Sequence, residues 1–561
     1  MILLYLGALL LAVGFTPWML ARLLAPHSKT PVTVSLWGPA MVALNTAIPV
    51  LLHLTGIRIT ATSLSAAHLI AAMMIGGASV ALRHRAIPPP EAPWPWLLTG
   101  SAVLFTILVI PVTHLAGIDT YKWQDLAGNI AVEGRIAWLI HPLSLFGFTP
   151  RSYPSAQPLL LATIEILGHT GVDWGFYLAS VALGLTGLFG AWRLGLHLFP
   201  AGRQAAWFAF LYCFAPVFAR YNYWATGRGM LLAFLPLFLL AWFRLPGVIR
   251  DAGHHPARLL RALLAVLAMS ILLALSHKAG FIGAILIPIL LILAPLFPVG
   301  RGRLLPLLFL AAALAAGLTL TGFAPATLIY RIATRFGWLA PLMMLGIGGA
   351  PARFQSPVGR AMLAASLTTL VLSFTPDMYG ALLALPFVTY AAVVGLGVLE
   401  ESRPIGRRLF APAPWLFGLT LLAAIAIIIN QAKDSPDNSV YRAAMFLERY
   451  DPKGPFRIEA PGRARTQIQG YVSGCPRFSV EPGDNPELVL HPPPAWSGNP
   501  ARDARRWIDY LRDALDLRGT TTDWYGTGTK VYAVTVNGEG AVPAQGKLIY
   551  SEGAIKIYAT P

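Results

Sequence analysis

The chain has 561 residues, of which 56% are hydrophobic and 12% are charged. It is far more apolar than an average soluble globular protein, which excludes an ordinary soluble enzyme. The formal net charge of +17 could indicate nucleic-acid binding, but the basic residues sit in short loops between apolar segments, where membrane topology explains them better. We therefore expect no nucleic-acid partner. The two cysteines, Cys213 and Cys475, lie far apart in the chain and predict neither a disulfide framework nor a metal site.

Apolar segments near the ~20 residues needed to cross a bilayer recur from the first residue to about Asn430. The first segment lacks a positive n-region and a small-residue cleavage site, so we expect that it is not a removed signal peptide. Arg22, His27 and Lys29 follow it and place its C-terminal end in the cytoplasm. Window length predicts about 14 transmembrane helices, at residues 2–22, 34–55, 63–82, 95–115, 174–196, 205–222, 229–245, 259–276, 279–298, 304–322, 337–350, 361–375, 379–399 and 415–431.

A shorter apolar segment, Leu159–Leu167, decides the orientation of the helices after it. If it does not cross, most Arg-rich short loops from Arg193 onward face the cytoplasm, as the positive-inside rule requires; if it crosses, all of them are inverted. We therefore interpret it as a half-inserted or interfacial helix. Both termini and an outer loop at residues 116–158 then face away from the cytoplasm, as do the short loops at residues 220–228, 276–278, 324–335 and 375–379.

The predicted fold class is an all-α polytopic membrane domain with a small C-terminal α/β domain. Residues 1–85 would form accessory transmembrane helices, residues 86–431 the transmembrane core, and residues 432–561 a soluble extracytoplasmic domain. In this last region, amphipathic helical patterns occur at residues 441–450 and 503–515, and strand-like segments at residues 456–459, 488–490, 530–536 and 556–559.

The outer loop carries clustered polar side chains among aromatic ones. Asp119 follows a predicted span, where a half-shielded carboxylate can act as a general base. Asp is also a preferred N-cap residue, and Asp119 alone does not distinguish the two roles. Asp125 and Glu133 fall on a predicted amphipathic surface helix at residues 121–138, where a solvated face is the simpler interpretation.

The same loop contains side chains suited to bind a phosphate or diphosphate. Arg151 offers a planar fork and Lys122 a point charge for phosphate oxygens, and His141 and Tyr153 lie in the same loop. An Arg near the lipid headgroups also serves as an interfacial anchor, so both interpretations of Arg151 stay open.

The order of these features resembles the membrane glycosyltransferases of the GT-C fold, which use polyprenyl-linked sugar donors. A span leads into an outer loop that opens with Asp119-Thr120-Tyr121, and a surface helix then leads to Tyr153-Pro154 and a short apolar helix. A soluble domain after the last span is also common in that family. The resemblance covers most of the chain after Pro95.

The resemblance implies that Asp119 is the essential acid that activates the acceptor. It also implies that basic residues at the outer ends of other spans hold the departing lipid phosphate, whose charge cations can neutralise. Lone cations at such positions also snorkel to the interface. The corresponding donor-binding candidates are Arg220, Arg228, His277 and Lys278.

The possible substrate contacts are Tyr121, Asp125, His141 and Asp377. Because an Asp that follows Pro in a loop is more often a turn residue, Asp377 also has that alternative role.

One departure from the family concerns its second outer loop, where many members place metal-binding acids. Here residues 223–229 read Tyr-Trp-Ala-Thr-Gly-Arg-Gly, and no side chain among them supplies a carboxylate to a hard cation. This argues against a divalent metal cofactor, and Arg228 would supply positive charge instead. The tail also has no WWD-like acceptor motif, which argues against an oligosaccharyltransferase proper.

The resulting hypothesis is an integral membrane glycosyltransferase. It would transfer a sugar from a polyprenyl-phosphate co-substrate to a lipid, glycan or protein acceptor on the extracytoplasmic face of a bacterial inner membrane, with Asp119 as the base. The alternatives are a transporter or flippase for a lipid-linked substrate and a non-catalytic assembly subunit. Coupled transporters usually carry ionisable residues near the membrane midplane, and the predicted spans have few.

Overall fold

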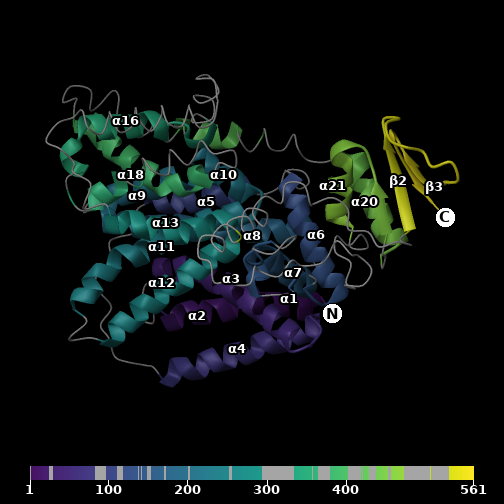
Figure 1. The fold of residues 1–561 in the computed structure, drawn as a ribbon, viewed down its shortest axis with the longest axis horizontal. Coiled ribbons are helices and arrows are strands. Elements are labelled where there is room, and N and C mark those ends of the chain that lie inside the picture. Colours follow the sequence, from purple (N-terminus) through teal and green to yellow (C-terminus); the bar gives the residue numbers. More distant parts are fainter. Residues whose placement is uncertain are drawn as a thin grey trace.

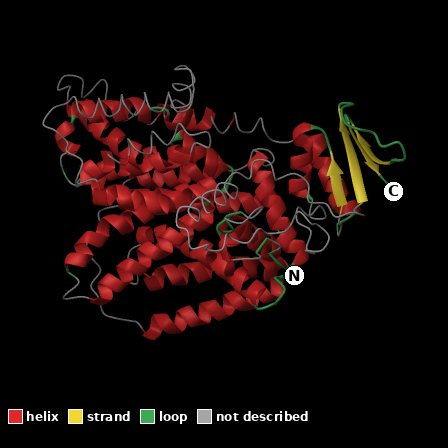
Figure 2. Ribbon diagram, in the orientation of Figure 1, coloured by secondary structure: helices red, strands yellow, loops and turns green. Residues whose placement is uncertain are grey.

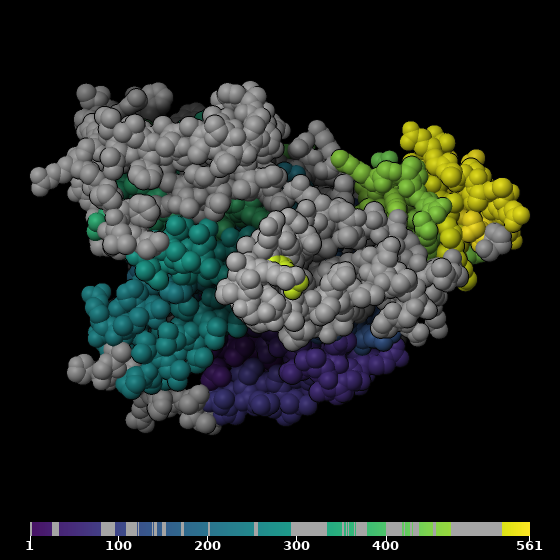
Figure 3. Space-filling model, in the orientation of Figure 1, coloured from purple at the N-terminus to yellow at the C-terminus, as the bar shows by residue number. Residues whose placement is uncertain are grey.

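The computed structural model describes residues 2–24, 30–81, 96–109, 118–136, 138–139, 142–147, 153–169, 172–199, 202–251, 256–293, 334–354, 356, 358–363, 365, 379–401, 418–419, 421–426, 429, 437–452, 456–472, 506 and 530–560. The described helices form a bundle, and a small sheet with two helices lies at one end of it (Figure 1). All described strands belong to this end piece (Figure 2), which projects from the bundle (Figure 3).

The bundle begins with α1 (Ile2–Leu9), the π-helical segment η1 (Leu10–Phe15) and α2 (Thr16–Leu24), which form one continuous apolar span. The helices that follow are α3 (Thr30–Leu54), α4 (Ala61–Ala81), α5 (Trp96–Val109), α6 (Ile118–Glu133), α7 (Ala156–Gly168), α8 (Val172–Leu198), α9 (Gly202–Cys213), α10 (Pro216–Tyr223), α11 (Gly227–Arg250), α12 (Pro256–Ser276), α13 (Lys278–Leu293), α16 (Leu339–Gly349) and α18 (Tyr379–Glu401).

Seven of the described helices are long and apolar enough to cross a membrane, which indicates an integral membrane protein. Four shorter apolar helices accompany them, among them α7 and α16. The span predicted at residues 304–322 lies outside the described residues, as do most of that at residues 361–375 and parts of that at residues 415–431. The predicted total of about 14 therefore stays a prediction.

The span predicted at residues 205–222 is wrong as one straight helix. The chain forms α9 and α10 instead, with Ala215 extended between them (φ −58°, ψ 138°). Pro216 lies in the first turn of α10, where its missing N–H costs nothing, whereas inside a helix it would remove a hydrogen bond. A window of hydrophobicity does not register this break, because it averages over the residues of both helices.

The short apolar helix α7 is buried within the protein. Its 13 residues span about 20 Å at ~1.5 Å per residue, short of the ~30 Å hydrocarbon core. At its start Gln157 donates to the carbonyl of Ala225, and shortly after its end the Asp173 carboxylate accepts a hydrogen bond from Tyr471 of the end piece (2.9 Å). The turn at Ala225 lies beside the same end piece, because Thr120 donates to the carbonyl of the neighbouring Trp224 and Tyr121 contacts Tyr471 of the end piece. Hence the chain enters and leaves α7 on one side of the bundle.

The end piece, called the tail here, contains α20 (Asn438–Tyr450), α21 (Gly462–Tyr471) and four strands. The strand order is β1-β2-β4-β3; β1 and β2 are parallel and the other pairs are antiparallel. The predicted strands at residues 456–459 and 530–536 coincide with β1 (Phe456–Glu459) and β2 (Lys530–Val536), and that at residues 556–559 falls in β4 (Ile555–Ala559). The helix predicted at residues 441–450 falls in α20.

Two tail elements were not predicted. The polar sequence of α21 lacks a clear apolar stripe, and β3 (Lys547–Glu552) is largely solvated. Both form because neighbours complete them: α21 packs against α6, and β3 pairs with β4. The strand predicted at residues 488–490 and nearly all of the helix predicted at residues 503–515 lie outside the described residues.

The end of the bundle beside the tail is called the tail face, and the opposite end, where α8, α11 and α18 terminate, is the far face (Figure 1). The N-terminal helices are integrated into the bundle, since α3 packs on α7 and α8. Arg193 of α8 donates to the hydroxyl of Ser35 in α3 (2.9 Å). Residues 1–85 are thus in direct contact with the region predicted as the core.

Helices α16 and α18 pack with their backbones in direct contact. A Cβ at Gly346 would overlap the carbonyl oxygen of Ala391 and lie 2.8 Å from the backbone nitrogen of Gly395. A Cβ at Gly395 would in turn overlap the carbonyl oxygen of Leu342. Glycine is therefore the residue that this contact admits.

We expect Gly346→Ala to lower the thermal midpoint of the purified protein, because overpacking costs roughly 1–3 kcal/mol. The matched control is Gly348→Ala in the same helix, where a Cβ meets nothing within 4 Å. Ala there is expected to be neutral, or stabilising by about 0.5–1 kcal/mol. Equal midpoints for the two variants in a detergent unfolding assay would contradict the backbone contact.

Candidate functional site

The turn between α10 and α11, residues Trp224–Thr226, is held from two sides. Thr120 in the first turn of α6 donates to the carbonyl of Trp224 (3.3 Å), and Gln157 of α7 donates to that of Ala225. Ala225 has a left-handed backbone (φ 41°), which is uncommon for a residue with a Cβ. Thr226 caps α11 by accepting from the N–H of Gly229. The segment predicted as the second outer loop is thus a fixed turn rather than a loose connection.

Gly227 brings this turn against the end of α12. A Cβ at Gly227 would overlap the carbonyl oxygen of Ser276 and lie 3.5 Å from the ring of Trp123. The residues that follow Ser276 are His277 and Lys278, so this contact places two predicted donor-binding residues beside the turn. Gly227 and His277 are about 50 residues apart in the sequence, and one close backbone contact brings them together.

Three arginines in the described part of the chain surround Tyr221 of α10. The guanidinium carbons of Arg228 and Arg220 lie 5.1 Å and 5.9 Å from the centre of its ring. Arg335 donates from Nη1 to the Tyr221 hydroxyl (3.4 Å). Arg220 also lies 4.7 Å from the centre of the Trp224 ring. Guanidinium groups over aromatic faces are oriented by the ring quadrupole, so Tyr221 and Trp224 position this cluster.

His277 and Lys278 are both buried, each 8% exposed. Burial lowers the pKa of His277 well below its usual range, and the positive charges of Arg228 and Lys278 lower it further. The His277 ring is therefore neutral at neutral pH. Its Nδ1 accepts from the N–H of Ala279 (3.1 Å), which leaves the proton on Nε2. Its ring also contacts that of Tyr379, the first residue of α18, at a centroid distance of 5.2 Å.

The predicted base, Asp119, lies in the first turn of α6, next to Thr120. The backbone therefore carries it to the turn at Trp224, although its side chain, like that of Lys122, is not among those described. Arg151, His141 and Asp377 lie outside the described residues. Tyr153 is described, and its ring contacts that of Trp123 in α6 (5.7 Å between centroids).

The predicted solvated face of α6 is wrong for Asp125, which is 3% exposed. The helix does not lie on an open membrane surface, because it is enclosed between α7 and α21. Glu133, near its end, is 17% exposed at its side chain and pairs with Arg135 (3.4 Å). The periodicity of α6 could not reveal this burial, since the covering helix comes from the distant tail.

The tail covers the start of α6 directly. Tyr121, predicted as a possible substrate contact, is fully buried, and its ring lies 5.7 Å from that of Tyr471 in α21. A Cβ at Gly470 would lie 2.7–2.9 Å from Tyr121 atoms, so the helix approaches as closely as its backbone allows. Tyr471 also donates to Asp173 at the start of α8. The tail and the region of Asp119 therefore lie at the same end of the bundle, and the tail covers the start of α6.

Two groups at this site were missed by the sequence reading. Arg335 belongs to a loop that was expected on the outer side, and its cluster partners lie more than 100 residues earlier. Glu165 of α7 accepts a hydrogen bond from Gln124 of α6 (2.8 Å). A carboxylate inside an apolar segment was the available signal for Glu165; for Arg335 no local signal existed.

Metal binding is not indicated in the part of the chain that the structure describes. Within it, no three His, Cys, Asp or Glu side chains lie close enough to share an ion. Asp119 and Asp377 are outside this comparison, because their side chains are not described.

Comparisons with known proteins add one structural likeness. No protein-family model matches the chain, and no curated protein does. Among solved structures, the chain is similar to a crystal structure of the Archaeoglobus fulgidus oligosaccharyltransferase with zinc and sulfate, at 16% identity and a TM-score of 0.47. The match covers 78% of this chain and 68% of that one. At these values the likeness supports no statement on activity.

The buried carboxyl of Glu165 predicts a pH-dependent contribution to stability. Burial raises the pKa of Glu165 to about 7; the hydrogen bond from Gln124 opposes this and Glu448 of the tail adds to it. Between the ordinary value of 4.5 and about 7, the folded protein keeps a proton that the unfolded chain releases. Stability from this group is therefore lost as the pH rises through that window.

We expect Glu165→Gln to remove this part of the pH dependence, because glutamine keeps the contact with Gln124 without a titrating proton. Thermal midpoints measured from pH 4.5 to 8 should diverge, with the variant more stable than the wild type at the upper end. Glu539→Gln, on an exposed tail turn, is the matched control and should follow the wild type. Parallel curves for the wild type and Glu165→Gln would refute the assignment.

Proposed function

We propose that this protein is an integral membrane glycosyltransferase that transfers a sugar from a polyprenyl-phosphate donor to a lipid, glycan or protein hydroxyl at the tail face. The observation that carries the proposal is the cluster of Arg220, Arg228 and Arg335 around Tyr221, with His277 and Lys278 adjoining. Guanidinium groups match phosphate oxygens in charge and geometry. This cluster suits a lipid phosphate that acquires charge as it leaves.

The position of the cluster distinguishes it from ordinary topological charges. Arg193, Arg250 and Arg353 lie toward the far face, where the positive-inside rule places the cytoplasm. Arg220, Arg228 and Arg335 lie at the tail face, where that rule predicts few cations. Topology therefore does not account for them, whereas an anionic substrate does.

The reaction would be an inverting displacement. The acceptor oxygen forms a bond to the anomeric carbon, Asp119 takes the acceptor proton, and the bond from that carbon to the lipid phosphate oxygen breaks. The phosphate leaves with the bonding electron pair, and the Arg cluster and Lys278 stabilise its negative charge. The Nε2–H of neutral His277 is a further hydrogen-bond donor for that phosphate.

The tail would shield the reacting groups from water. The start of α6, which carries Asp119, lies under α21, with Tyr121 against Tyr471. Exclusion of water strengthens electrostatic interactions inside a site and protects a reactive donor from hydrolysis. The acceptor would approach Asp119 from beside the tail, and the donor would enter from the membrane.

Asp119→Asn should lower transfer by about 10²–10⁴-fold, the usual contribution of a general base. The assay measures turnover by the purified protein in proteoliposomes with radiolabelled polyprenyl-phosphate sugars and no ion gradient. Asp251→Asn, an exposed residue at the far face, makes the same chemical change and should retain activity. Full activity of Asp119→Asn would refute the assigned base. No turnover by the wild type with any such donor would favour the flippase or assembly-subunit alternative.

Arg228→Ala should lower transfer by about 10²–10³-fold, comparable to loss of one preorganised donor at a developing anion. Arg250→Ala is the matched control, because Arg228 and Arg250 lie at opposite ends of α11 and Arg250 is exposed at the far face. Assays of both variants with one donor should separate them. Equal activity of the two would show that the cluster does not hold the phosphate.

A further inference from the structure

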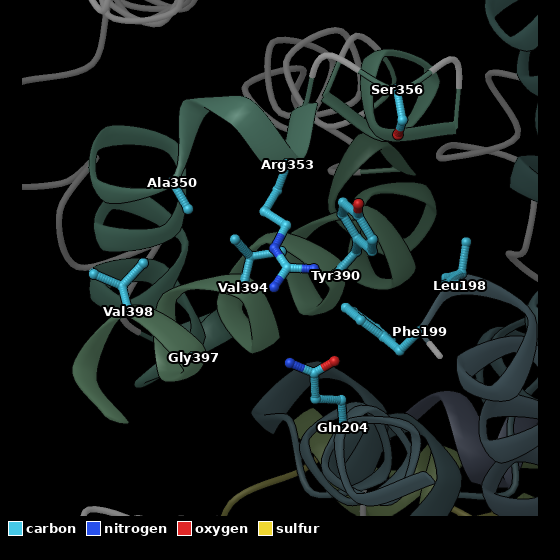
Figure 4. Close-up of a pocket in the computed structure, with 10 residues that line it drawn as sticks. All are labelled: Leu198, Phe199, Gln204, Ala350, Arg353, Ser356, Tyr390, Val394, Gly397 and Val398. Carbon is cyan, nitrogen blue, oxygen red and sulfur yellow. The ribbon is translucent and has the colours of Figure 1, made fainter. Parts of the chain in front are cut away.

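A polar cavity lies at the far face, distant from the Arg cluster around Tyr221. It has a volume of about 270 Å³ and is formed by the end of α8, the start of α9, the segment after α16 and the last turns of α18 (Figure 4). Val394–Val398 of α18 lie roughly 25 Å along the helix from Tyr379, at ~1.5 Å per residue. The cavity is therefore separate from the proposed transfer site.

Three polar side chains from different elements line this cavity. Arg353 comes from the 3₁₀ helix Pro351–Phe354, Gln204 from the first turn of α9, and Tyr390 from α18. Figure 4 shows the Arg353 guanidinium extending into the space between α18 and Gln204, whose amide faces it. Among the described residues, none of the three side chains has a hydrogen-bond or ion-pair partner. Arg353 is exposed and Gln204 is half-buried, so their donors are accessible to a ligand that enters the cavity from the surface.

The other walls of the cavity are mostly apolar. Leu198, Phe199, Val394 and Val398 line them, next to the polar group. A ligand that satisfies both parts needs an anionic, hydrogen-bonding head and an apolar portion attached to it. A guanidinium with nearby amide and hydroxyl groups suits a phosphate, to which Arg can bind through two parallel hydrogen bonds.

The geometry disfavours a nucleotide. The Phe199 and Tyr390 rings stack on each other (5.2 Å between centroids, 26° between planes), and the edge of Phe354 also contacts Tyr390. The facing sides of the Phe199 and Tyr390 rings are thus in contact with each other and do not receive a base. The volume also lies just below the ~300–1,000 Å³ of typical small-molecule sites, which suits a headgroup better than a nucleotide.

We propose that this cavity binds the phosphate headgroup of an anionic phospholipid from the membrane leaflet at the far face. Arg353 supplies the charge, Gln204 and Tyr390 supply hydrogen bonds, and the apolar wall receives the start of the acyl chains. The site does not depend on the transfer reaction, and it is tested by binding alone.

The test titrates the full-length protein in detergent with short-chain phosphatidylglycerol and follows the thermal midpoint, which rises with occupancy of a site in the folded state. Short-chain phosphatidylcholine and inorganic phosphate are the comparison ligands. We expect saturable stabilisation by phosphatidylglycerol, at concentrations where the other two give none.

Arg353→Ala should weaken phosphatidylglycerol binding by about tenfold or more, as expected for loss of a hydrogen-bonded charge. Arg258→Ala, an exposed arginine at the same face outside the cavity, should bind as the wild type does. Tyr390→Phe keeps the ring contacts and removes only the hydroxyl, so it should fold and bind severalfold more weakly.

Three outcomes would overturn the proposal. Equal weakening of phosphatidylglycerol binding by Arg353→Ala and Arg258→Ala would mean that the lipid is attracted by general surface charge. Equal stabilisation by phosphatidylcholine would mean that no anionic head is recognised. Equal stabilisation by inorganic phosphate would mean that the site takes free phosphate and that the apolar wall contributes nothing.

Discussion

The backbone of the turn at Trp224–Thr226 is the point where the distant parts of the site are joined. Thr120 of α6 and Gln157 of α7 donate to its carbonyl oxygens, and Gly227 lets it rest on the last carbonyl of α12. Buried carbonyl groups are costly unless they are paired, so these bonds fix where α6, α7 and α12 meet. Without these bonds, Asp119 in α6 would have no fixed position relative to the basic residues that follow α10 and α12.

Positive charge is found at both ends of the bundle. Arg193, Arg250 and Arg353 lie toward the far face, on the side where the positive-inside rule predicts the cytoplasm. At the tail face, Arg220, Arg228 and Arg335 converge on one phenol, and the neutral ring of His277 lies beside Lys278. This second group is the one to which we assign the lipid phosphate of the proposed donor.

The tail is part of the site's architecture rather than an appended module. Its helix α21 buries Tyr121 and shields Asp125, and Tyr471 links it to the start of α8. Glu165 extends this arrangement inward through Gln124, with Glu448 of α20 close enough to act on it. The tail, the helix α6 that carries Asp119 and the buried helix α7 thus form one packed unit.

The sequence by itself determined the membrane class, the short helix at residues 159–167, the α20 helix and the strands β1, β2 and β4, because hydropathy and local periodicity are properties of contiguous residues. It also singled out Arg220, Arg228, His277 and Lys278 by their positions at helix ends. Only the tertiary structure decided that Arg335 joins them, that α9 and α10 are separate helices, and that Asp125 is buried. Those outcomes depend on close approaches between segments more than 100 residues apart and on a single backbone break at Pro216, and neither leaves a periodic signal in the chain.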